Sequence, residues 1–162
     1  MAVEPLARRL GVTKGSFYSH FSDRAELVEA ALLRWERAHA DAFEASLRQA
    51  EDPANQLEGL MRMAIAAAGT RTIQGRLLLE SDEPRVREAL QRVTELRLRR
   101  LTGIFTELGH PPGVAESRAT VAYAIYIGLL QLAREVPERL ADEEALGAEL
   151  LGIIAGGRSP SQ

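Results

Sequence analysis

The stretch Leu6-Ala-Arg-Arg-Leu-Gly-Val-Thr-Lys-Gly-Ser-Phe-Tyr-Ser-His-Phe21 decides the fold of the first part of this chain. Its apolar residues recur three and four positions apart, which predicts two short helices. Gly11 lies between them, at a position where a helix-ending residue of positive φ favours glycine. Thr13 follows as the predicted N-cap of the second helix. The stretch therefore predicts two helices joined by a tight turn.

The second of these helices has two different faces. Phe17 and Phe21 lie four residues apart, so we expect them to face inward. The other side would expose one cation, hydroxyls and an imidazole, which suit DNA phosphates and base edges: Lys14, Ser16, Tyr18 and His20. Residues 1–24 hold four basic side chains against two acidic ones, a weak electrostatic footprint of DNA binding. The alternative is the ordinary surface of a small helical hairpin.

The same stretch resembles the helix-turn-helix of the TetR family of bacterial transcriptional regulators. The resemblance continues through Ser22-Asp23-Arg24-Ala25-Glu26-Leu27. It implies an all-α fold, with a DNA-reading head on a helical body that binds a small-molecule effector and forms a homodimer. It also implies contacts with double-stranded operator DNA by Thr13, Lys14, Gly15, Ser16, Tyr18, His20 and Arg24. Of these, Lys14, Gly15 and Ser16 would lie nearest the bases.

The resemblance further implies a first helix that packs across these two. The first of the two helices predicted here has already begun by Val3, so we expect the helix that would precede it to be absent and the head to be incomplete. We therefore expect the face of Leu6, Leu10, Phe17 and Phe21 to be half-covered. A half-covered face buries too little apolar surface to offset the entropy of ordering the chain. Two interpretations stay open. One is a DNA-binding regulator, and the other is an effector-binding helical dimer without DNA-binding activity.

The composition and the remaining motifs indicate no catalytic site. The 162 residues include no cysteine and carry a formal net charge of −3. His20, His39 and His110 share no metal-ligand spacing. There is no Ser-His-Asp arrangement or phosphate loop, so we expect neither an enzyme nor a cofactor. No apolar run is long enough for a membrane span and no secretory signal is apparent, so we expect a cytoplasmic protein.

The rest of the chain predicts further helices and no strand. Periodicity and breakers indicate helices over residues 22–50, 55–68, 72–79, 84–108, 114–134 and 142–154. The long helix from Ser22 would link a head of residues 1–38 to a body of residues 39–155. We expect residues 156–162 to form a flexible tail. The arginines of helix 84–108 indicate a solvated face with surface ion pairs such as Glu95 with Arg99.

The last two predicted helices mix small and large apolar residues, which suits close packing of helices. The resemblance implies that they pair with their copies in a four-helix bundle, through Ala119, Ala122, Ile125, Leu129, Leu146, Leu150 and Ile153. The alternative is a core within one chain.

The expected effector is apolar or amphipathic, because few ionisable residues interrupt the inner stripes of the body. Relatives surround the effector with helices that here carry Met61, Ile65, Leu78, Leu101, Phe105, Tyr123 and Tyr126. Plain core packing explains these residues equally well. Three basic residues would be the candidates to balance a charged ligand: Arg71, Arg76 and Arg118.

Overall fold

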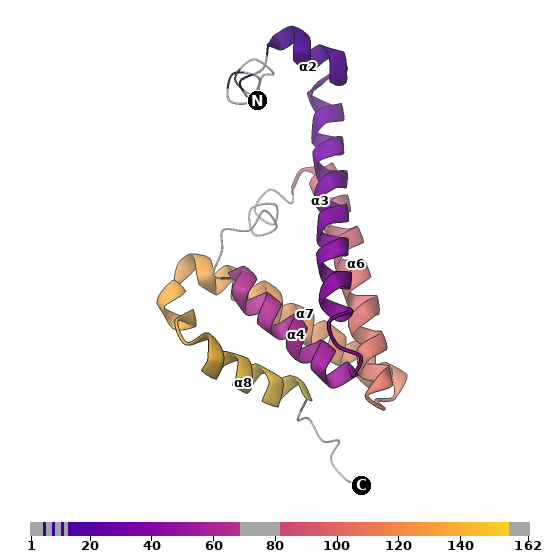
Figure 1. Cartoon of the computed structure of the whole chain (residues 1–162), viewed down its shortest axis with the longest axis vertical. Coiled ribbons are helices and arrows are strands. Elements are labelled where there is room, and N and C mark those ends of the chain that lie inside the picture. The colour runs from indigo at the N-terminus through magenta and orange to yellow at the C-terminus, as the bar shows by residue number, and fades with distance from the viewer. Residues whose placement is uncertain (1–4, 6–7, 9–10, 12, 69–81, 156–162) are drawn as a thin grey trace. The chain divides into compact units, whose positions relative to one another are not determined.

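The computed structural model describes residues 5, 8, 11, 13–68 and 82–155. These residues form helices joined by turns, and no strand occurs among them (Figure 1). The predicted all-α class is therefore confirmed. The chain divides into two compact units, Met1–Ala38 and His39–Gln162. The helix expected over residues 72–79 and most of the first helix of the hairpin lie outside the described residues.

The first unit contains α2 (Lys14–His20) and the beginning of α3 (Arg24–Leu47). Gly11 has φ of +68°, which is the left-handed conformation expected at the turn. The side chain of Thr13 accepts a hydrogen bond of 3.1 Å from the Ser16 N–H. Thr13 is thus the N-cap of α2, as the sequence predicts.

A reciprocal set of side-chain hydrogen bonds begins α3 directly after α2. The Asp23 carboxylate accepts from the Glu26 N–H at 2.9 Å. The Glu26 carboxylate accepts from the Ser22 N–H at 2.6 Å and from the Ser22 hydroxyl at 2.7 Å. These bonds satisfy donors that the first turn of a helix leaves without partners. The two helices of this unit therefore keep separate axes instead of merging into one.

The second unit contains the end of α3, then α4 (Pro53–Ala68), α6 (Pro84–Glu107), α7 (Pro112–Glu135), the short 3₁₀-helix η2 (Pro137–Leu140) and α8 (Glu143–Ala155). Acidic side chains cap three of these helices. Asp52, Glu83 and Asp142 accept from backbone N–H groups three residues later, at 2.9–3.0 Å. Asp142 therefore caps α8, and Pro84 lies in the first turn of α6.

The turn between α6 and α7 has the geometry of a Schellman motif. Gly109 has φ of +88°, and its N–H donates to the Thr106 carbonyl at 2.9 Å. The His110 N–H donates to the Phe105 carbonyl at 3.1 Å. These two bonds satisfy the last carbonyls of α6, and Pro112 then begins α7. The short turn makes α6 and α7 antiparallel neighbours.

The core of this unit lies where α4, α6 and α7 pack together. Ala115, Ala119 and Ala122 form a stripe of small buried residues on α7. Phe105 of α6 has none of its surface exposed and belongs to the same cluster as these alanines. Figure 1 shows α4 beside α7, with α8 along α4. The small residues let α7 approach α6 closely enough for the large side chains to fill the space between them.

Candidate nucleic-acid interface and ligand groove

Helix α2 buries one face and exposes the other. Phe17 is 4% exposed. Its ring meets the Tyr18 ring edge-on at 5.3 Å between centroids and the tilted Phe21 ring at 5.7 Å. All seven residues predicted to contact DNA are exposed: Thr13, Lys14, Gly15, Ser16, Tyr18, His20 and Arg24. The aromatic contacts therefore hold the apolar face, while the polar residues remain accessible to a partner.

Gly15 leaves the first turn of α2 open to close approach. A Cβ atom at this position would have the Thr13 hydroxyl oxygen as its nearest neighbour, at 3.8 Å, which is an ordinary contact. Packing among the described residues therefore does not require glycine here. Lys14 and Ser16 lie on either side of it and are exposed. The first turn of α2 thus combines a cation, a hydroxyl and an unobstructed backbone, which suits a groove of duplex DNA.

The part of the chain that matches a protein-family model includes this surface. The family model described as "Bacterial regulatory proteins, tetR family" matches residues 1–31, which include α2 and the first turns of α3. Residues 1–31 are therefore similar to the TetR family. Comparisons with curated proteins and with solved structures found no match. The TetR-family match indicates a DNA-binding regulator, since members of this family are regulators rather than enzymes.

The hydrogen bonds that cap the beginning of α3 change the acidity of the Glu26 side chain. The hydrogen bond from the Ser22 hydroxyl lowers the pKa of Glu26 below its usual 4.5, and the Ser22 N–H adds to the effect. Both bonds favour the charged carboxylate. A lowered pKa in the folded state stabilises the fold above the pKa of the unfolded chain. This stabilisation is lost as the pH falls through the lowered value.

We therefore expect acid to weaken the beginning of α3. A titration of the Glu26 side-chain carboxyl carbon by NMR should give a pKa below 4.5. Ser22→Ala removes the hydroxyl donor and should raise that pKa, while Ser19→Ala, whose hydroxyl bonds to the Ser16 carbonyl instead, should leave it unchanged. A pKa at or above 4.5 in the unmodified chain would contradict the capping geometry.

The residues predicted to bind the effector fall into different environments. Met61, Leu101 and Phe105 are buried in the cluster that joins α4, α6 and α7, with Tyr123 packed against it. Ile65 belongs to a second cluster with Leu129 and Leu150, and Tyr126 packs against that cluster. Leu78, Arg71 and Arg76 lie outside the described residues. Leu101 and Phe105 act as core residues here, and effector binding by the predicted set stays a prediction.

Arg97 corrects the expectation that the arginines of α6 form a solvated face. Its side chain is only 7% exposed. The guanidinium carbon lies 4.9 Å from the ring centroid of Tyr126 and 5.9 Å from that of Phe43. Burial raises the pKa of the Tyr126 hydroxyl, and the positive charge of Arg97 partly opposes this increase. Arg97 therefore joins the end of α3, α6 and α7 through cation–π contacts.

Other polar contacts of the body follow more closely from the sequence. The Tyr123 hydroxyl lies 2.8 Å from the Thr94 hydroxyl, so a tyrosine at the edge of the core has its polar partner. Glu95 and Arg99 form the predicted surface pair at 3.7 Å. Arg118 donates to the Ile154 carbonyl at the end of α8, which makes it a helix-capping residue.

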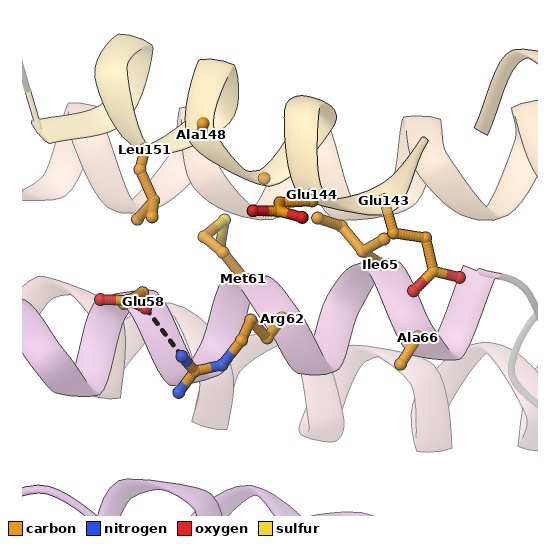
Figure 2. A pocket seen from close by; sticks show the side chains of 10 residues that line it. Glu58, Met61, Arg62, Ile65, Ala66, Glu143, Glu144, Ala148 and Leu151 are labelled. Atoms are coloured by element: carbon orange, nitrogen blue, oxygen red, sulfur yellow. Dashed lines mark hydrogen bonds and ion pairs between the residues drawn. The ribbon is translucent and has the colours of Figure 1, made fainter. Parts of the chain in front are cut away.

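A groove of about 500 Å³ lies between α4 and α8 (Figure 2). It contains Met61 and Ile65 from the predicted ligand set. Three carboxylates that we did not predict also line it: Glu58, Glu143 and Glu144. The sequence contained a signal, because the lining residues of each helix recur three or four positions apart and so share one helical face. The sequence does not say which faces of α4 and α8 meet, because that depends on the tertiary packing.

The residues predicted to form the dimer interface are mostly buried within one chain. Ala119 and Ala122 are each 1% exposed, Leu129 is 4% exposed and Leu150 is 8% exposed. Ile125 and Leu146 are half-buried, and Ile153 is 61% exposed. A second copy could not reach the four buried side chains. A glutamate at Ala122 or Leu150 would therefore disturb folding before it tested dimerisation.

Helix α7 nevertheless presents an apolar stripe on its surface. Val114, Val121 and Leu132 are 36%, 50% and 42% exposed. Their spacings place them within about 20° of one line along the helix, since each residue turns the helix by about 100°. Half-buried Ile125 and Gly128 lie within about 40° of Val114 on the same side of the helix. The spacing of these five residues is that of a coiled-coil seam.

Among residues 13–68 and 82–155, no group of His, Asp and Glu side chains could hold a metal ion. None of the helices described by the structure is long and apolar enough to cross a bilayer.

Proposed function

We propose that this chain is a TetR-type transcriptional repressor that acts in the cytoplasm as a homodimer. Two copies of α2 read the half-sites of a palindromic operator, with Lys14, Gly15 and Ser16 nearest the bases. Phosphates are contacted by Thr13, Tyr18, His20 and Arg24. An apolar or amphipathic small molecule bound in the second unit relieves repression.

One observation carries this proposal. All seven predicted contact residues are exposed on and next to α2, and all lie within the family-matched residues 1–31. The capping bonds of Thr13 and Glu26 fix where α2 and α3 begin, so the polar residues keep a constant spacing. Two-fold symmetric operators need two such surfaces, and the exposed stripe of α7 offers a seam for the second copy.

The relief of repression follows from linkage between two sites. A ligand that binds the body more tightly in one conformation shifts the population of DNA-binding dimers. Helix α3 belongs to both units, so it can transmit a displacement of its C-terminal end to its N-terminal end. Phe43 and Glu44 attach that end to α6, the latter through a 2.6 Å ion pair with Arg100.

DNA binding by the chain should respond to changes on α2. With duplex DNA from the region upstream of its own coding sequence, Lys14→Ala should weaken binding about tenfold or more. Tyr18→Phe, which removes a phosphate contact, should weaken binding less and on all sequences alike. Affinity should fall steeply with salt, and Arg24→Ala, which removes a cationic phosphate contact, should lower that slope by about one. Fluorescence anisotropy at several salt concentrations measures both quantities.

Glu29→Gln is the matched control, because Glu29 is exposed on α3 and outside the predicted contact set. It should bind at least as tightly as the unmodified chain. Equal affinities for Lys14→Ala, Tyr18→Phe and the unmodified chain would contradict the proposed surface. Absence of any DNA affinity would favour the effector-binding dimer without DNA-binding activity.

A further inference from the structure

The groove between α4 and α8 combines an apolar floor with an acidic rim. Met61 and Ile65 of α4 are each 4% exposed and form the floor, with Leu151 of α8 half-buried beside them. Glu143 and Glu144 are exposed in the first turn of α8. Figure 2 shows Glu144 next to Met61 and Ile65, and Glu143 reaching toward α4 near Ala66. Apolar and negatively charged surfaces therefore meet within one groove.

The two helices that form the groove approach each other at Gly147. A Cβ atom at Gly147 would lie 3.4 Å from the terminal methyl of Ile65, so α8 packs against α4 there. The neighbouring Ala148 is exposed and small, which leaves the volume of about 500 Å³ unfilled. Volumes of this size accommodate a drug-sized molecule.

The charges of the groove do not balance. Arg62 is the cation among its lining residues, and Glu58 pairs with it at 2.7 Å. In the described part of the chain, neither Glu143 nor Glu144 forms an ion pair with a basic side chain. A guest that covers these carboxylates removes water from them, which is unfavourable unless the guest carries a positive charge. An anionic guest would add repulsion to that loss.

We propose that this groove binds an amphipathic cation, with its apolar body on Met61 and Ile65 and its charge beside Glu143 and Glu144. The inference specifies the effector of the proposed repressor and rests on that function for its biological role. Its chemistry rests on the groove alone. Binding is measured without DNA, so failure of the cation site and failure of operator binding give different results.

Tetraphenylphosphonium and tetraphenylborate are suitable probes, because they have the same shape and opposite charges. Isothermal titration of the full chain should show that the phosphonium binds at least about tenfold more tightly than the borate. Glu143→Gln combined with Glu144→Gln should weaken phosphonium binding about tenfold and leave borate binding equal or stronger. Glu149→Gln is the matched control, since Glu149 is exposed on α8 and does not line the groove.

A second variant tests the apolar part of the groove. Ala148→Trp fills the space with an indole and keeps both carboxylates, so it should abolish phosphonium binding. Because Glu143 and Glu144 also favour the N-terminus of α8, thermal unfolding of each variant checks that the fold persists. Borate binding as tight as phosphonium binding would overturn the proposal. So would unchanged phosphonium affinity in the double glutamine variant or in folded Ala148→Trp.

Discussion

Replacing Val121 and Leu132 together with glutamate should convert the protein from dimers to monomers. Both side chains are exposed on the apolar stripe of α7, where a second copy would bury them. Burying a large aliphatic side chain contributes about 1.5–3 kcal/mol, and a dimer buries each of these residues twice. The variant also places four carboxylates in one interface. The dissociation constant should therefore rise by about a thousandfold or more, as measured by sedimentation velocity.

The same double variant should lose operator affinity without any change to α2. Two linked heads bind a palindrome more tightly than one head does, by a factor of about 10² or more. Thr120→Glu is the control, because Thr120 is exposed on α7 away from the stripe. It should remain dimeric. A wild-type chain that is monomeric at micromolar concentration would contradict dimerisation through the apolar stripe of α7. A double variant that stays dimeric would contradict it too.

Replacing Phe105 with alanine should lower the free energy of unfolding by about 3–5 kcal/mol. Phe105 has no exposed surface and packs in the cluster that joins α4, α6 and α7. The alanine would leave a cavity that the alanine stripe of α7 is too small to fill. Urea unfolding followed by circular dichroism measures the loss. Phe105→Leu keeps most of the volume and should cost clearly less.

A loss below about 1 kcal/mol for Phe105→Ala would show that this side chain does not lie in a packed core. That outcome would favour the other interpretation of Phe105, in which it lines an effector cavity. Comparison with Thr120→Ala, at an exposed position of α7 away from the apolar stripe, gives the scale of a surface change. This second variant should alter stability by about 0.5 kcal/mol or less.

Local signals predicted the helices and their ends well. The cap at Thr13 and the turn at Gly11 each depend on a few neighbouring residues. Such interactions act in the same way wherever the helix finally packs. The exposed face of α2 was predictable for the same reason, since helical spacing alone separates Phe17 from Lys14 and Tyr18.

Features that depend on packing between helices were less predictable. Arg97 occurs at the same helical spacing as the apolar residues Val93 and Leu101, so its burial had a signal, but six arginines on one helix favoured a solvated interpretation. The alanines of α7 suit a dimer seam and an internal seam equally well, and the structure places Ala119 and Ala122 inside the chain. The groove depends on which faces of α4 and α8 meet, which no local pattern decides.

Selection of duplex DNA from a random library by the full chain tests the central claim most directly. A TetR-type regulator with two copies of α2 should enrich a palindrome whose half-sites are about one helical turn of DNA or a small multiple of it apart. Ser16→Ala should relax the sequence preference inside the half-sites and keep their spacing. Enrichment of no sequence over the starting library, by a chain shown to be folded and dimeric, would contradict operator recognition by α2.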